Sequence, residues 1–206
     1  RNITATDVTA EAFVTVWPCG TPRPLASNLN VRAGATRPNL VIAAVGAGGR
    51  VCVFTQRSMH LIADITGYVP ITSSYSPIVP RRVLETRVDG QTGYQGAKPG
   101  TGQVIELQVV GAGLAPTGTG AVALNLTATE VDADLFVTVW PCGADRPTTS
   151  SLNAAAGDTT AVLVMAAVGT GGRVCIFTQL PAHLIADLSG WFPTGSTYLP
   201  IVPDRL

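Results

Sequence analysis

Histidine and aspartate occur together twice in this 206-residue sequence, at His60 and Asp64 and again at His183 and Asp187. Combined with a serine, these residue types can support nucleophilic catalysis. Both pairs lie in short apolar stretches typical of β-strands, where residues i and i+4 share a face but stand about 13 Å apart. The sequence has no Gly-x-Ser-x-Gly nucleophile elbow. We therefore interpret these residues as polar groups at strand ends, and we predict no catalytic residues and no enzyme activity.

Two groups of carboxylates precede the repeated Phe-Val-Thr-Val stretch: Asp7 with Glu11, and Glu130 with Asp132 and Asp134. Loop carboxylates can bind Ca²⁺, and paired carboxylates can hydrolyse glycosidic bonds. The Asp-x-Asp-x-Asp-Gly pattern of a calcium loop is absent, and Asp132 aligns with Thr9 in the other copy. We interpret the acids as solvated turn residues and predict neither a metal nor a cofactor.

Aromatic residues suggest a binding function. Flat aromatic rings on a β-sandwich can stack on sugar rings, and the candidates are Trp191, Tyr68, Tyr75 and Tyr198. Trp17 and Trp140 are expected to be core residues instead. Strand alternation places Phe13, Thr15, Trp17 and Cys19 on one face, which we expect to point inward because Cys19 is expected to form a disulfide.

The four cysteines occur as Cys19 with Cys52 and Cys142 with Cys175. The internal duplication favours the bridges Cys19–Cys52 and Cys142–Cys175, one in each copy; buried free thiols are the alternative. Each bridge would close a loop that the chain-entropy model values at about 3–4 kcal/mol. Structural disulfides indicate an oxidising compartment.

The duplication appears when the chain is shifted by 123 positions, since about 50 of the 83 overlaid residues are then identical. The first repeat spans residues 1–83. The second spans 84–206 and consists of a front segment and linker, 84–123, followed by the duplicated part, 124–206. A period of this length is typical of a domain rather than of a solenoid repeat.

The pattern of each copy predicts an all-β fold. β-branched residues dominate, and Gly, Pro, Asn and Thr interrupt them at short intervals. The complete copy predicts seven to eight short strands: residues 104–110, 121–129, 135–140, 151–154, 161–168, 173–179, 183–188 and 198–202. The glycines at 169–172 predict a hairpin turn. We expect two tandem β-sandwich or jelly-roll-like domains, with a prism or a barrel as alternatives.

The first copy has no counterpart of residues 84–123 and so lacks the expected strand at 104–110. It either lacks an edge strand or borrows one, from residues 84–123 or from another chain. An edge without its strand exposes backbone groups and favours strand addition. This uneven duplication is where we expect function to reside.

Charge and hydropathy limit the partners. Charged residues make up 13% of the chain, and the formal net charge is zero. A nucleic-acid surface needs clustered Lys and Arg, but Lys98 is the one lysine, so we predict no nucleic-acid partner. The longest apolar run is far below the ~18 residues of a membrane span. No signal peptide is recognisable, and the start at Arg1 suggests a processed or excised chain.

Several blocks together resemble a disulfide-containing tandem repeat of secreted actinobacterial surface and hydrolase-associated proteins. The blocks cover residues 16–20, 23–24, 27–30, 50–54, 60–64, 67–68 and 82–87. The resemblance spans nearly the whole chain and implies an extracellular, non-catalytic module. It assigns no role to single residues.

Three functional hypotheses follow. The first is a secreted or cell-surface repeat for adhesion or extracellular assembly, with self-association by strand exchange. The second is a carbohydrate-binding module attached to a secreted hydrolase, with a cell-wall or extracellular glycan as partner. The third, an enzyme, has the least support, because each candidate motif has a simpler structural interpretation.

Overall fold

The structure is a computed structural model that describes residues 2–65, 67–70 and 72–203, and strands dominate it. The strands are β1 (Asn2–Thr6), β2 (Ala12–Pro18), β3 (Leu29–Val31), β4 (Arg37–Leu40), β5 (Val51–Thr55), β6 (His60–Asp64), β7 (Ser76–Glu85), β8 (Val104–Gln108), β9 (Thr119–Thr129), β10 (Leu135–Pro141), β11 (Leu152–Ala154), β12 (Thr160–Ala167), β13 (Arg173–Thr178) and β14 (His183–Pro193). Two 3₁₀ turns, Ala47–Gly49 and Thr170–Gly172, complete the elements.

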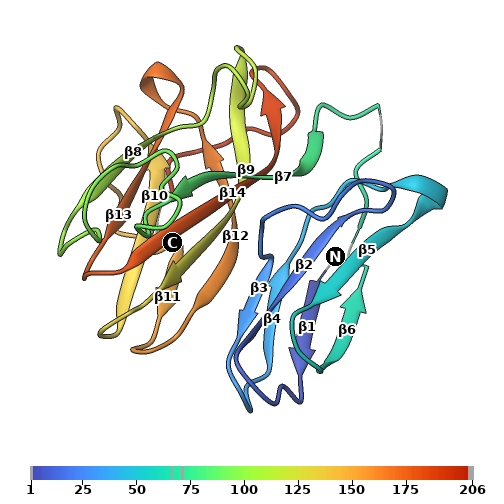
Figure 1. Ribbon diagram of the computed structural model, residues 1–206. Coiled ribbons are helices and arrows are strands. Elements are labelled where there is room, and N and C mark those ends of the chain that lie inside the picture. The colour runs from blue at the N-terminus through green and yellow to red at the C-terminus, as the bar shows by residue number, and fades with distance from the viewer. Residues whose placement is uncertain (1, 66, 71, 204–206) are drawn as a thin grey trace.

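The strands form two units that lie side by side (Figure 1). The first unit, β1–β6, contains the sheets β4-β1-β6 and β3-β2-β5. The second unit, β7–β14, contains the sheets β12-β9-β14-β7 and β11-β10-β13-β8. All strand pairs are antiparallel. The predicted all-β architecture with two sandwiches is confirmed.

β7 connects the units in sequence but belongs to the second one in structure. It pairs with β14 from Ser76 to Glu85, and it lies beside that strand in Figure 1. The boundary expected between residues 83 and 84 therefore falls inside a strand of the second unit. Residues 104–108 lie in the segment named above as one source of a borrowed strand, but they form β8 and pair with β13 of the second unit.

Each unit has its core between its two sheets. Val14 and Val16 are buried in the first core, and Val137 and Val139 in the second. This corrects the expected orientation of residues 13–19, because the alternate face points inward. Trp140 instead packs with the Cys142–Cys175 disulfide in a separate small cluster. Both predicted disulfides, Cys19–Cys52 and Cys142–Cys175, are confirmed.

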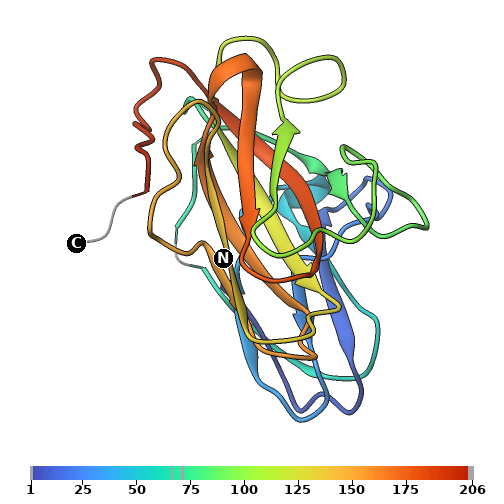
Figure 2. The same ribbon diagram turned by 90° about the vertical axis from the view of Figure 1, so that its left-hand side faces the viewer.

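Two predicted elements differ in the structure. Residues 198–202 do not form a strand, although the equivalent residues of the first copy begin β7. In Figure 2 the segment after β14 runs outside the sheets, where it has no neighbouring strand to pair with. The glycine turn at 169–172 does not close a hairpin either, because β12 and β13 belong to different sheets. The turn instead carries the chain from one layer of the sandwich to the other.

Buried polar residues join the two units. The Asn39 side-chain amide donates to Asn125 Oδ1 at 3.0 Å, and Asn39 Oδ1 accepts from the Leu163 amide at 3.2 Å. Asp158, which is almost fully buried, forms an ion pair with Arg32 at 2.6 Å and accepts a hydrogen bond from Arg37 at 3.1 Å. Four of these positions differ between the copies, since Asn39, Arg32, Arg37 and Asp158 align with Val162, Ala155, Thr160 and Ala35. Residues that differ between the two copies thus make polar contacts between the two units.

Candidate functional site: the open side of the first unit

His183 and Asp187 lie on β14 but have different partners. His183 Nδ1 is 3.0 Å from Thr86 Oγ1, and this hydroxyl also accepts the Leu184 amide at 2.9 Å. Asp187 binds Arg82 on β7, with Oδ1 2.7 Å from Arg82 Nε. Both side chains therefore attach the strand β7 and its continuation to β14.

The Arg82–Asp187 pair extends into a four-residue ion network. Glu85 accepts from Arg82 at 2.7 Å and from Arg87 at 2.8 Å. Burial alone would raise the pKa of Glu85, but the hydrogen bonds and charges of the two arginines outweigh it and hold that pKa below its usual value. Burial raises the pKa of Asp187, which Arg82 only partly opposes. A buried carboxylate at this place in the sheet thus depends on an arginine from the neighbouring strand.

The sheet β4-β1-β6 of the first unit corresponds to β12-β9-β14-β7 of the second, but has no described strand in the position of β7. β14 lies between β9 and β7, whereas β6, in the same position, pairs only with β1 among the described residues. β13 likewise lies between β10 and β8, whereas β5 pairs only with β2 in the described part of the chain. The sequence predicted one missing strand; the structure leaves two positions without a described strand, those of β7 and β8.

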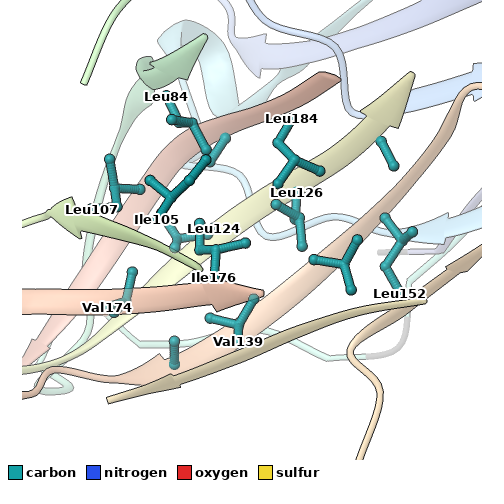
Figure 3. Packing of buried hydrophobic residues seen from close by; sticks show 14 of the residues in the cluster. Leu84, Ile105, Leu107, Leu124, Leu126, Val139, Leu152, Val174, Ile176 and Leu184 are labelled. Atoms are coloured by element: carbon teal, nitrogen blue, oxygen red, sulfur yellow. The ribbon is translucent and has the colours of Figure 1, made fainter. Parts of the chain in front are cut away.

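Apolar side chains are uncovered where these two strands are missing. Leu61 and Ile62 are 38% and 51% exposed, whereas their counterparts Leu184 and Ile185 are 0% and 5% exposed. In the second unit the core beside β14 and β13 is filled by side chains of β7 and β8. Figure 3 shows this packing of Leu84, Ile105, Leu107, Ile176 and Leu184. We call the uncovered outer edges of β5 and β6, with Val53, Leu61 and Ile62, the open side of the first unit.

The predicted stacking aromatics do not share one exposed surface. Tyr75 is buried, its hydroxyl donates to the Ser189 carbonyl at 3.3 Å, and burial raises its pKa. Its ring contacts Phe192 with centroids 4.8 Å apart, and Tyr198 stacks on Phe192 at 4.7 Å. Trp191 is half-buried against the second core. Tyr68 is 88% exposed and follows β6 in the first unit.

The acidic candidates have structural partners. Lys98 binds Asp132 at 3.1 Å, Asp134 accepts the Ala156 amide at 2.9 Å, and Glu11 accepts from Thr159 at 3.3 Å. Among the described residues, no three His, Cys, Asp or Glu side chains gather where they could hold a metal ion.

A cleft of about 420 Å³ lies between the units, with Glu11, Arg23, Arg82 and Arg87 among its lining residues. Its three arginines already have partners. Arg23 lies 3.8 Å above the Phe54 ring, and the other two bind Glu85. The arginine side chains that line this cleft thus already bind other residues of the chain.

Comparison with protein-family models, curated proteins and solved structures finds no match. In the described part of the chain, no helical segment has both the length and the apolar character needed to cross a bilayer. The functional argument therefore rests on the internal comparison of the two units.

Sequence reasoning missed Arg82, Glu85 and Thr86 as partners of the histidine and aspartate. A signal was present, because Arg82 is repeated at position 205 and lies a fixed distance after the repeated Pro-Ile-Val-Pro. The sequence did not reveal this pairing because Arg82 lies at the end of the first copy, whereas Asp187 lies on β14 in the second copy.

Proposed function

We propose that the chain is a non-catalytic module that acts outside the cell, in adhesion or assembly, by accepting β-strands at the open side of its first unit. The observation that carries this proposal is the contrast between β6 and β14. They have the same five residues, His-Leu-Ile-Ala-Asp, and only β14 has a described strand on its outer edge.

The physical argument concerns unpaired backbone groups. An edge strand presents free N–H and C=O groups that can pair with an added strand. The open side combines such an edge with the exposed apolar residues Val53, Leu61 and Ile62. An incoming strand would therefore gain both hydrogen bonds and apolar burial, as in other cases of β-strand addition.

An extracellular location is part of the proposal. Two disulfides are favoured in oxidising compartments, and the sequence resembles secreted actinobacterial repeats. The alternative, a glycan-binding module, has less support because Tyr75 is buried and Tyr198 stacks on Phe192 within the same chain.

Light scattering after size exclusion, over a range of protein concentrations, tests the proposal together with electron microscopy. We expect concentration-dependent association that Leu61→Lys weakens, since a lysine on an edge strand opposes pairing. Val88→Lys is the matched control, because Val88 is an exposed residue that lies outside the strands. A protein that stays monomeric and non-adherent at all concentrations would contradict the proposal.

A further inference from the structure

The second unit shows in detail how β14 holds its neighbour. β7 runs antiparallel to β14 with Glu85 opposite Ile185, Leu84 opposite Ala186 and Arg82 opposite Asp187. The Thr86 amide donates to the Leu184 carbonyl at 3.2 Å, and the Thr86 side chain bonds both His183 and the Leu184 amide. Asp187 therefore binds Arg82 and His183 binds Thr86, so two residues of β14 that are four positions apart recognise two residues that are four positions apart on the neighbouring strand.

The histidine and aspartate that bind the neighbouring strand in the second unit are also present on the open side of the first unit. His60 and Asp64 occupy the positions of His183 and Asp187, and β6 pairs with β1 in the same register as β14 with β9. Ala5 lies opposite Leu61, as Ala128 lies opposite Leu184. His60 and Asp64 are exposed here, whereas their counterparts are buried under the neighbouring strand. β6 thus carries the complete recognition pattern of β14 on an accessible edge.

We propose that the edge of β6 is a sequence-specific receptor for a β7-type strand from another copy of this repeat unit. The strand runs antiparallel to β6, its arginine binds Asp64, and its threonine, four residues later, binds His60. This inference rests on the proposed strand-accepting function and names the partner by its chemistry, an extended segment with the pattern Arg-x-x-Glu-Thr.

Charge and shape select this strand over the other edge strand of the unit. Glu106, the central acid of β8, pairs with Arg173 on its own side of the sandwich, and β8 offers no arginine to an aspartate. Leu84 of β7 is fully buried in the cluster that contains Leu184. An equivalent leucine on the incoming strand would cover Leu61 in the same way. A β7-type strand therefore matches β6 in both its ion pair and its apolar residue.

The chain contains a second segment of the β7 type. Residues 198–203 repeat the pattern of 75–80, with Tyr198, Pro200 and Ile201 matching Tyr75, Pro77 and Ile78, and position 205 is again an arginine. Leu199 and Ile201 are 78% and 76% exposed, and this stretch pairs with no strand among the described residues. This segment repeats the first part of the β7 pattern, without the Glu-Thr that follows Arg82. A β7-type strand of one copy bound to β6 of the next would generate a head-to-tail, open-ended contact.

A labelled peptide with the sequence of residues 75–89 tests the inference on the full chain by fluorescence anisotropy. We expect saturable binding and hydrogen-exchange protection of residues 60–64. Arg82→Glu in the peptide should weaken binding at least about tenfold, as expected for a close charge pair in an interface. Arg81→Glu is the matched control, because it changes charge equally and Arg81 is not bound to Asp187.

A charge reversal provides the decisive comparison. Asp64→Arg in the protein should reject the natural peptide and recover binding of the peptide with Arg82→Asp. Asp64 is exposed, so the variant should fold, which circular dichroism verifies. Absent binding, equal losses for the Arg81 and Arg82 peptides, or no recovery with the reversed pair would overturn the inference. If the peptide does not bind but the chain still associates with itself, the inference fails and the proposed function stands. If the peptide binds but the chain is strictly monomeric and non-adherent, the proposed function fails and the inference stands.

Discussion

β6 and the first five residues of β14 have identical sequences and opposite environments. All five residues of β6 are exposed, whereas the same five residues in β14 are buried. Neither propensity nor composition can account for this, since both are equal. The core face of β14 is covered with the help of β7 and β8, which contribute Leu84, Ile105 and Leu107 to the second core. The opposite face lies against the first unit, where the Ser27 backbone hydrogen-bonds Asp187. Burial of this strand therefore depends on its neighbours, and the following changes test that dependence.

Leucine truncation should produce the largest difference between the units. Leu184→Ala should destabilise the second unit by about 2–5 kcal/mol, because it removes a fully buried side chain and leaves a cavity. Leu61→Ala should cost the first unit about 1 kcal/mol or less, because Leu61 is already partly solvated. Hydrogen exchange with mass spectrometry in denaturant measures each unit separately. Equal losses would mean that β6 is covered as β14 is.

Disulfide removal should affect both units, but in a defined order. Replacing Cys142 and Cys175 by serine should cost the second unit about 3–4 kcal/mol through the loop that the bridge closes. With limiting reductant, the Cys19–Cys52 bridge should open first, because its cysteines are half-buried and those of the second bridge are buried. Differential alkylation followed by mass spectrometry gives the order. Earlier opening of Cys142–Cys175 would contradict the comparison.

Aspartate substitution isolates the ion pair across the sheet edge. Asp187→Ala should destabilise the second unit by about 2–3 kcal/mol, below the usual cost of breaking a buried pair because Glu85 still neutralises Arg82. Asp64→Ala should change the first unit by less than about 0.5 kcal/mol, since this side chain is exposed. Chemical denaturation of both variants gives the comparison. A large loss on Asp64→Ala would show that it already has a partner.

The smallest effect concerns the contact between the units. Asp158→Ala gives the second unit the residue that the first unit has at the equivalent position, Ala35. Losing the ion pair with Arg32 and the hydrogen bond from Arg37 should cost about 1–2 kcal/mol, because both arginines are partly solvated. Thermal unfolding should then separate into two steps if this contact couples the units. An unchanged, single transition would assign the coupling to Asn39 and Asn125 instead.

The sequence was sufficient to predict the all-β fold, most of the strands and the two disulfides, because each depends on local pattern or on the repeat. The strand expected at residues 198–202 and the hairpin expected at 169–172 do not form. The sequence correctly placed Phe13 and Trp17 on one face of their strand but wrongly expected that face to point inward, since both faces carry apolar residues and only the second sheet distinguishes them. It also did not predict β7 as a strand of the second unit. The pairing of β7 with β14 crosses the boundary between the repeats and depends on tertiary contacts, which the alternation of apolar and polar residues along a strand does not reveal.

That function resides where the duplication is uneven stays a prediction. The structure shows that the two units differ at their sheet edges, because β7 and β8 have no described counterparts in the first unit. The aromatic candidates were chosen by type, yet Phe192, which was not among them, lies between Tyr75 and Tyr198. The sequence led us to interpret His60 and Asp64 as polar groups at strand ends, because the side chains that bind their counterparts His183 and Asp187 are visible only in the structure of the second unit.

The ring stack of Tyr75, Phe192 and Tyr198 has a mechanical consequence. β7 begins where β14 ends, with Ser76 opposite Trp191. Tension along the chain would therefore pull residue 75 and residue 194 apart at the same end of the strand pair, and would peel its hydrogen bonds one after another. The three rings, with the Tyr75 hydroxyl bonded to Ser189, lie at this fork. These contacts must break before the hydrogen bonds between β7 and β14 can separate from this end, so the three rings set the first resistance of the strand pair to tension.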